Sequence, residues 1–290
     1  MWRIKIFIVD LSQTMISTFM ATIGNHTNIP VEEDLLRHMV LNAIRSYNVK
    51  FRREYGEMII ACDDRRSWRK ELFPYYKANR HKDREESEID WNTVFEILNK
   101  VRDELKEYFP YKVIHIDRAE ADDIIGTLVH EHGNTVQRIM IVSGDKDFRQ
   151  LQTYVNVKQY DPTRKKYLEE RDPDRYLREH ILRGDRGDGV PNFLSQDDCF
   201  VVGVRQKQLR ETKLNIWVDQ NPEEFCDETM LKRYNRNKQM VDLSLIPDDI
   251  KTSIMESYNT QQEIKKSRNN LFNYFIEHKL KNLIETINEF

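Results

Sequence analysis

The sequence has 290 residues, of which 33% are charged, and a formal net charge of −3 at pH 7. That length allows one large domain or two modest ones, and the chain-wide basic balance typical of nucleic-acid-binding proteins is absent. No apolar run approaches the roughly 18 residues of a membrane span, and the opening stretch MWRIKIFIVDLSQ lacks the cleavage site of a signal peptide. Three cysteines without metal-ligand spacing favour a reducing cytosol and exclude a disulfide framework or a structural zinc site.

Four short apolar runs predict buried strands. They cover residues 4–9, 58–62, 112–116 and 138–142. Helical patterns lie between them, and Asp90 is predicted to cap one such helix, with Val94 and Leu98 on its buried face. Strands that alternate with helices predict an α/β fold with a mostly parallel central sheet covered by helices. Strand patterns end near residue 190, so we expect an α/β domain over residues 1–190 and a helical region over residues 191–290.

Every predicted strand is followed by carboxylates. In chain order these are Asp10, then Asp63 and Asp64, then Glu120, Asp122 and Asp123, and finally Asp145 and Asp147. Each acid alone has an ordinary explanation as a turn residue or a helix cap, but coincidence at four successive strand ends is a poor explanation. The carboxyl ends of parallel strands meet at one edge of an open sheet, where ligands bind. A further pair, Asp185 and Asp188, lies in GDRGDG beyond the sheet.

Carboxylates gathered in a cleft cannot all stay ionised without cations. Ligand sets made only of oxygen suit Mg²⁺ or Mn²⁺, which also bind phosphate. The acids outnumber the needs of one ion, so we expect two Mg²⁺ ions, with Mn²⁺ able to substitute. Two such ions can flank a phosphodiester, activate a water and stabilise the leaving oxygen.

Residues 65–84 carry eight lysines and arginines against two acids, a net charge of +6 in a chain that is acidic overall. Trp68, Phe73, Tyr75 and Tyr76 lie among these cations. Cations neutralise phosphates and aromatic rings stack on unpaired bases. The alternative is a solvated surface helix with some rings in the core, which we expect for Phe73. Because the segment directly follows Asp63, we expect it to lie next to the acidic cluster.

These motifs together resemble those of the 5′-nuclease superfamily of flap endonucleases and 5′–3′ exonucleases. The matching stretches, in family order, are IVD at Asp10, CDDRRSWRKELFPYYKANR from Cys62, EADD from Glu120, SGDKDFRQL from Ser143 and GDRGD from Gly184. The later NKQMVDLSLIP and INEF are similar to the ribonuclease H branch of T-even-type bacteriophages. The resemblance implies a PIN-like core, a basic helical arch at about residues 65–90, and a C-terminal region for duplex and partner contacts. It also implies Mg²⁺-dependent removal of RNA primers and adjoining DNA from 5′ ends, with cleavage at flap junctions.

The resemblance implies roles for individual residues by their motif positions. The implied metal ligands are Asp10, Asp63, Glu120, Asp122, Asp123, Asp145, Asp147, Asp185 and Asp188. Asp147, Asp185 and Asp188 would lie toward the second ion. Within the arch, Lys77 and Arg80 would act in catalysis by gripping the scissile phosphate, and Tyr76 would grip it too or stack on a base. The implied nucleic-acid contacts are Arg66, Arg69, Tyr76, Lys77, Arg80, Arg205, Lys207, Arg210 and Lys213.

The chain departs from the family pattern after GDRGD. Gly189 stands where the family usually has asparagine, and residues 190–213 keep a single glycine, so a monovalent-cation site is not implied and duplex contact falls to the later cations. Expected partners are RNA–DNA hybrids, flapped or nicked duplex DNA, and a single-stranded-DNA-binding protein contacting the C-terminal helices. The chain starts almost directly in its first strand, so sliding-clamp contact through an N-terminal extension is not expected. We expect a monomer, without membrane contact, in the cytoplasm of the infected bacterial host.

Three other functions would explain parts of the same sequence pattern. A haloacid-dehalogenase-type phosphatase needs a second aspartate two residues after Asp10, and that position is Ser12. A PIN-type ribonuclease shares the core and the acids, but PIN domains are shorter and lack the basic insert and GDRGD. A structure-specific DNA-binding protein that holds metals without turnover remains an alternative.

Overall fold

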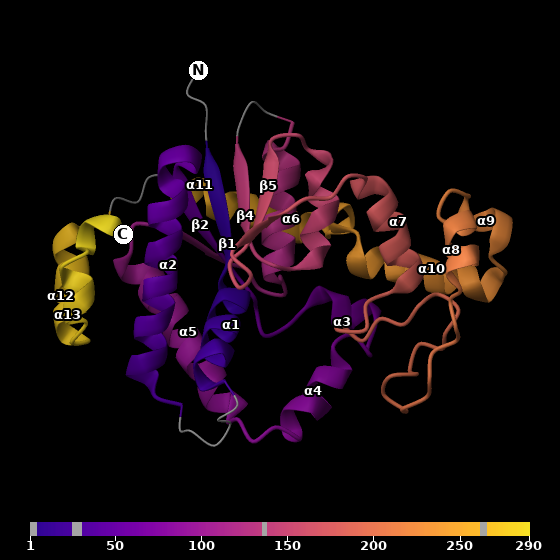
Figure 1. The fold of residues 1–290 in the computed structure, drawn as a ribbon, viewed down its shortest axis with the longest axis horizontal. Helices are drawn as coiled ribbons and strands as arrows, with labels where there is room; N and C mark the ends of the chain where they lie inside the picture. Colours follow the sequence, from indigo (N-terminus) through magenta and orange to yellow (C-terminus); the bar gives the residue numbers. More distant parts are fainter. Residues whose placement is uncertain (1–4, 25–30, 135–137, 262–265) are drawn as a thin grey trace.

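A six-stranded sheet in the order β3-β2-β1-β4-β5-β6 forms the centre of the molecule (Figure 1). The computed structural model describes residues 5–24, 31–134, 138–261 and 266–290. The strands are β1 Ile6–Asp10, β2 Glu57–Cys62, β3 Lys112–His115, β4 Ile139–Val142, β5 Val157–Asp161 and β6 Lys166–Leu168. Neighbouring strands from β3 to β5 pair parallel, and β6 pairs antiparallel with β5. The predicted α/β class with a mostly parallel sheet is confirmed.

The four predicted strands are present, with ends that differ by one or two residues from those expected; Ile4 lies outside the described residues. Strands β5 and β6 did not emerge from the sequence pattern. Their sequences, VKQYD and KYL, contain few apolar residues. β6 is the edge strand, where pairing with a neighbour rather than burial on both faces defines a strand. β5 is mostly buried, but the polar residues Lys158, Gln159 and Asp161 interrupt its apolar pattern.

Helices cover both faces of the sheet, and 3₁₀ turns connect several of them. The α-helices are α1 Leu11–Ile23, α2 Glu33–Tyr55, α3 Trp68–Leu72, α4 Ala78–Glu85, α5 Trp91–Tyr108, α6 Ala121–His132, α7 Pro173–Arg183, α8 Glu211–Trp217, α9 Pro222–Phe225, α10 Glu228–Val241, α11 Asp248–Thr260, α12 Arg268–Glu277 and α13 Lys281–Ile284. The 3₁₀ turns are η1 Lys146–Thr153, η2 Leu243–Leu245 and η4 Ile287–Glu289. Asp90 caps α5 as predicted, accepting a hydrogen bond from the Thr93 amide at 3.1 Å. Within the described ranges, no helix combines the length and apolar character needed to cross a bilayer.

Two apolar cores form because side chains alternate along each strand. Phe7 and Val9 of β1 pack with α1, α2, α5 and α12 on one face. Ile6 and Ile8 point to the opposite face and pack with α6 and α11. Helices α11 and α12 therefore return to the sheet, although they come late in the chain.

Two further segments surround the carboxyl ends of the strands. Helices α3 and α4 connect β2 to α5 and lie beyond the sheet on one side (Figure 1). Helices α8, α9 and α10 form a side lobe with α7, around a small core that contains Phe193, Leu214 and Val218 (Figure 1). Residues 191–210 contain no helix among the described residues, so within the expected helical region of residues 191–290 the first helix begins at Glu211.

Candidate active site

The strand-end carboxylates converge at one edge of the sheet. Parallel register between β1, β2 and β4 places Asp10 next to the positions from which Asp63 and Asp145 extend. Asp10 interacts electrostatically with both of these residues, and Asp122, from the first turn of α6, interacts with Asp10, Asp145 and Asp147. The structure thus brings together acids that are separated by up to 137 positions in the chain.

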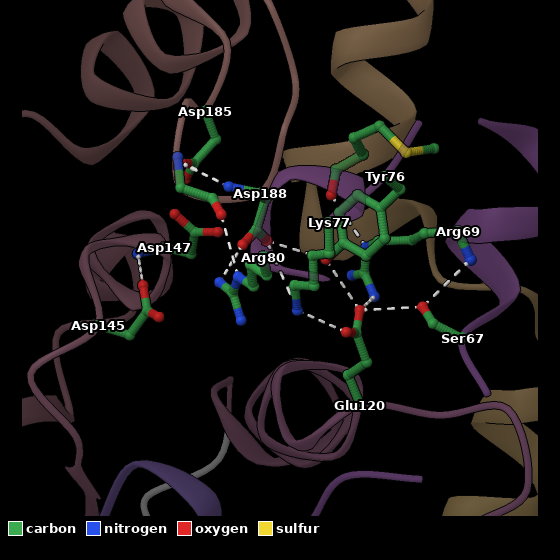
Figure 2. Close-up of polar contacts among 12 residues, drawn as sticks. Ser67, Arg69, Tyr76, Lys77, Arg80, Glu120, Asp145, Asp147, Asp185 and Asp188 are labelled. Atoms are coloured by element: carbon green, nitrogen blue, oxygen red, sulfur yellow. Dashed lines mark hydrogen bonds and ion pairs between the residues drawn. The ribbon is translucent and has the colours of Figure 1, made fainter. Parts of the chain in front are cut away.

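The loop after α7 adds Asp185 and Asp188 to this group. Both interact electrostatically with Asp147, which begins η1 together with Asp145. Figure 2 shows Lys77 and Arg80 between Glu120 and four aspartates on the other side of the site, which are Asp145, Asp147, Asp185 and Asp188. The predicted convergence of the late acidic pair with the strand-end acids is therefore present in the geometry.

Several of these carboxyls are more easily protonated than usual. Burial raises the pKa of Asp10 to about 7, and the nearby charges of Asp63 and Asp145 add to it. Hydrogen bonds to Asp10 from the Gln13 amide at 2.9 Å and the Ser143 hydroxyl at 3.2 Å only partly offset this. Burial, with carboxylate neighbours, also raises the pKa values of three further aspartates. These are Asp122, Asp145 and Asp147.

Such a cluster is suited to divalent cations, because a bound positive charge would replace the protons that burial and mutual repulsion favour. The buried Oδ1 of Asp147 has no hydrogen-bond partner among the described residues. Asp63 is already oriented, since its Oδ1 accepts a hydrogen bond from the Ala121 amide at 2.8 Å.

Glu120 differs from the other acids because cations of the arch surround it. Its two carboxylate oxygens lie 2.5 Å from Lys77 Nζ and 2.9 Å from Arg69 Nη1, and they accept hydrogen bonds from Tyr76 and Ser67 (Figure 2). Burial would raise the pKa of Glu120, but Lys77 and Arg69 outweigh burial and lower it to about 2. Glu120 is therefore ionised and paired within the protein itself.

The base of the arch is attached to the GDRGD loop. The Lys77 amide donates to the Asp188 carbonyl at 2.7 Å, and the guanidinium of Arg80 pairs with the Asp188 carboxylate (Figure 2). Gly189 has a φ of +71°, and a Cβ there would lie 2.9 Å from the Tyr75 carbonyl oxygen. Glycine at position 189, the departure from the family pattern, is thus what the close approach of arch and loop requires.

Arg69 and Asp123 are buried and paired with each other in the structure described. Arg69 is only 2% exposed, its Nη2 lies 2.9 Å from Asp123 Oδ1, and its Nε donates to the Met240 carbonyl at 3.0 Å. In the structure described, the guanidinium of Arg69 is therefore paired within the protein, and the nucleic-acid contact by Arg69 stays a prediction. Asp123 is fully buried and its Oδ2 accepts hydrogen bonds from Trp68 Nε1 and the Glu120 amide, so these partners occupy the carboxylate, and its role as a metal ligand stays a prediction. The two residues instead fasten α3 to α6.

Tyr76 is also buried, at 2% exposure. Its ring lies in a small apolar cluster with Phe73, Ile181 and Val190, and its hydroxyl donates toward Glu120 and Asp188. The ring has no exposed face in the structure described, so stacking of a base on Tyr76, which stays a prediction, would require the ring to leave this cluster. Phe73 is buried, as the sequence predicted.

The remaining predicted cations are at the surface. Arg66 is exposed and pairs with Asp117 near the carboxyl end of β3. The exposed later set comprises Arg205, Lys207, Arg210 and Lys213. Arg205 and Lys207 line an open groove of about 940 Å³ together with Arg183 and Arg186, which sequence reasoning had not singled out.

Two further residues of the acidic site were missed. Lys146 Nζ lies 2.9 Å from Asp185 Oδ2, so a cation sits between Asp145 and Asp147 in sequence and faces their cluster in space. His180, in the last turn of α7, is buried and directs Nε2 toward Asp147 at 3.3 Å. Burial lowers the pKa of His180 to about 4. The charge of Lys146 was visible in SGDKDF, whereas a single histidine at a helix end carries no signal of its own.

Family comparisons match the whole described fold. The family model for the 5′-3′ exonuclease N-terminal resolvase-like domain matches residues 5–179, and the model for the T4 RNase H C-terminal region matches residues 173–290. The chain is 34% identical to the ribonuclease H of Enterobacteria phage T4, over 98% of this chain and 95% of that protein. It is 30% identical to the flap endonuclease Xni of Shewanella pealeana, over 83% of this chain and 92% of that protein.

The solved structures that resemble the chain share its fold. One is the flap endonuclease of bacteriophage T5 in a complex with DNA and metal ions, with a TM-score of 0.66 and 17% identity. The match covers 89% of this chain and 99% of that one.

Proposed function

The chain belongs to the 5′-3′ exonuclease family, and from this premise we propose that it is a metal-dependent 5′-nuclease. It would hydrolyse phosphodiesters from the 5′ ends of RNA–DNA and DNA duplexes and at flap junctions. The similar proteins named ribonuclease H and flap endonuclease support this range of substrates. The observation that carries the proposal is a buried carboxylate cluster bordered by cations of α3, α4 and the turn between them, as expected where a phosphodiester is held over metal ions.

Two Mg²⁺ ions are the proposed cofactors, with Mn²⁺ as a substitute. Asp10, Asp63, Asp122 and Asp145 would hold the first ion, with Asp147 bordering both. The raised pKa values of the buried aspartates support this assignment. Asp185 and Asp188 would lie toward the second. When bound, the ions supply positive charge that activates a water and stabilises the leaving oxygen.

Glu120 has a conditional place in this proposal. It can reach a cation only if Lys77 leaves its carboxylate, since Lys77 Nζ now lies 2.5 Å away. The same exchange frees the ammonium of Lys77. Lys77 and Arg80 are therefore proposed to exchange carboxylate partners for the scissile phosphate when ions enter the site.

Duplex contact is assigned to the side lobe. Arg205, Lys207, Arg210 and Lys213 are exposed, and the groove beside them carries Arg183 and Arg186. Duplex held there and a single strand held by the arch would place the junction phosphate over the carboxylates. Cations that neutralise phosphates act without regard to base sequence, which suits a nuclease that recognises junction structure.

The biological setting is proposed from the phage relative. Removal of RNA primers during phage DNA replication, in an infected bacterial cell, matches a ribonuclease H relative from a bacteriophage. Contact between the C-terminal helices and a single-stranded-DNA-binding protein stays a prediction, as does the monomeric state. The C-terminal helices are not a separate body here, because α11 and α12 pack against the sheet.

Matched flap substrates test the proposal. Duplexes with a 5′ flap or a 3′ flap of the same length, each labelled at the opposite end, are incubated with the protein in Mg²⁺ and in EDTA. We expect products from the 5′ side in Mg²⁺ only, and loss of cleavage in Asp145→Asn with the fold retained. Equal or faster removal of the 3′ flap would refute the polarity.

The same substrates separate the alternatives. A PIN-type ribonuclease would cleave single-stranded RNA without need of a duplex junction. A catalytically silent binding protein would shift the flap substrate in a gel and leave it intact with Mg²⁺.

A further inference from the structure

His180 of α7 lies at the edge of the acidic site, next to Asp147 and Asp185, and these three residues are called the histidine corner. His180 Nε2 lies 3.3 Å from Asp147 Oδ1 and 3.7 Å from Asp185 Oδ2. These three residues each offer a ligand atom within 4.8 Å of the other two, and all three are buried. The histidine comes from α7, whereas Asp147 comes from η1, so two separate elements converge on this point.

The facing atoms of this corner lack ordinary hydrogen bonds. His180 Nε2 and Asp147 Oδ1 are both buried, and neither has a hydrogen-bond partner among the described residues. The histidine side chain is only 7% exposed. A buried histidine with a purely structural role normally has its ring nitrogens satisfied. A nitrogen and a carboxylate oxygen that face each other without hydrogen-bond partners indicate that both can bind the same cation.

The local backbone holds the corner in place. The ring of Tyr176 stacks on His180 at a centroid distance of 5.9 Å. Gly184 ends α7 with a φ of +66°, and a Cβ there would lie 2.4 Å from the Val190 carbonyl oxygen. Only glycine fits this turn, so the turn determines where Asp185 lies relative to His180.

We propose that His180 is a nitrogen ligand, with Asp147 and Asp185, of the second cation, and that this position, which Mg²⁺ can occupy, binds Mn²⁺ more tightly. The inference rests on the proposed function only in taking a divalent cation as the occupant. Ligands about 2.1 Å from an octahedral ion are separated by roughly 3 to 4.2 Å. The two distances from His180 Nε2 fall within that range.

The donor set determines the choice of metal. Mg²⁺ prefers oxygen ligands and retains its waters, whereas an imidazole nitrogen raises affinity for the transition metals. Lys146 Nζ, 2.9 Å from Asp185 Oδ2, supplies positive charge at this corner in the structure described. Its side chain is 48% exposed, so it can turn to solvent when a cation enters.

Pulsed electron paramagnetic resonance of Mn²⁺ bound to the full chain tests the ligand directly. We expect modulation from a coordinated ¹⁴N nucleus, which changes to the ¹⁵N pattern when the protein is made with ¹⁵N-histidine. This readout uses the unaltered chain and needs no catalysis. Absence of nitrogen coupling at full Mn²⁺ occupancy would overturn the proposal.

Variants supply the selectivity test. In His180→Gln, the nitrogen coupling should vanish, and the ratio of Mn²⁺ to Mg²⁺ affinity at this position should fall by at least about tenfold, the loss that follows even from changing an outer partner of a metal ligand. His278→Gln is the matched control, since His278 lies 4.0 Å from Glu104 in a different part of the molecule. An unchanged ratio in folded His180→Gln, checked by circular dichroism in EDTA, would also overturn the proposal.

The two proposals can fail separately. A chain that shows nitrogen coupling but cleaves no flap would refute the nuclease and leave the histidine ligand standing. A chain that cleaves flaps without nitrogen coupling would do the opposite.

Discussion

Replacing Arg69 by alanine is expected to destabilise the fold more than any change to an exposed arch cation. Arg69 is 2% exposed and lies 2.9 Å from both Glu120 and Asp123. Removing it leaves Glu120 with Lys77 at 2.5 Å, but it deprives fully buried Asp123 of its guanidinium. The change is therefore the loss of one partner from a buried ion pair.

The magnitude follows from that geometry. Removing one partner of a buried pair costs about 3–5 kcal/mol because the remaining charge is uncompensated. The Met240 carbonyl also loses the hydrogen bond that Arg69 Nε donates at 3.0 Å, worth about 1 kcal/mol. Since part of the Glu120 pairing survives, we expect the free energy of unfolding to fall by about 3–5 kcal/mol in all.

Urea unfolding in EDTA at pH 7 measures this change. Arg66→Ala is the control, because its side chain is 70% exposed and its loss should alter stability by less than about 0.5 kcal/mol. Adding Asp123→Asn to Arg69→Ala should restore part of the stability by removing the unpaired charge. If Arg69→Ala cost less than about 1 kcal/mol and weakened DNA binding as Arg66→Ala does, the structural reading of Arg69 would be refuted.

Three other outcomes are expected. Because the folded pKa of Asp10 is about 7, above the ordinary 3.8, the ion-free fold binds more protons than the unfolded chain between those pH values. The ion-free fold should then lose up to roughly 4 kcal/mol of stability as the pH rises from about 4 to 7. Melting temperatures measured in EDTA should change less with pH in Asp10→Asn than in the unaltered chain. Parallel curves of melting temperature against pH would contradict this. Lys77→Ala should lower the single-turnover cleavage rate at saturating enzyme by roughly a hundredfold, as for loss of a preorganised donor. Lys70 is exposed, so Lys70→Ala should mainly weaken binding. Equal single-turnover rates in the two variants would argue against contact between Lys77 and the scissile phosphate. Gly189 and Gly203 both have a positive φ that strains alanine, but only at position 189 would the Cβ contact the arch. Gly189→Ala should therefore slow single-turnover cleavage, whereas Gly203→Ala should not. A similar loss in both variants would show that backbone strain, not the contact, is responsible.

Local patterns carried much of the fold. The apolar runs of β1 to β4 were visible because a strand buried on both faces is a short continuous apolar stretch, whatever its neighbours. β5 was hidden because three of the five residues in VKQYD are polar, although most of the strand is buried between its neighbours. The position of Asp10, Asp63 and Asp145 at strand ends followed from the same patterns and the rule for parallel sheets.

The acids that gather at the sheet edge could be predicted from local patterns, because strand ends are local features and parallel pairing aligns them. The partner of each charge could not, because it depends on how distant segments pack. Arg69 contacts Glu120 across 51 positions of the sequence, and His180 contacts Asp147 because α7 packs beside η1, which no residue pattern predicts. Burial of a charge depends on which partner the whole fold places beside it, since an unpaired charge cannot be buried cheaply. Because that pairing depends on the folded chain, neither the burial of Arg69 nor the contact of His180 with Asp147 could be predicted from the sequence.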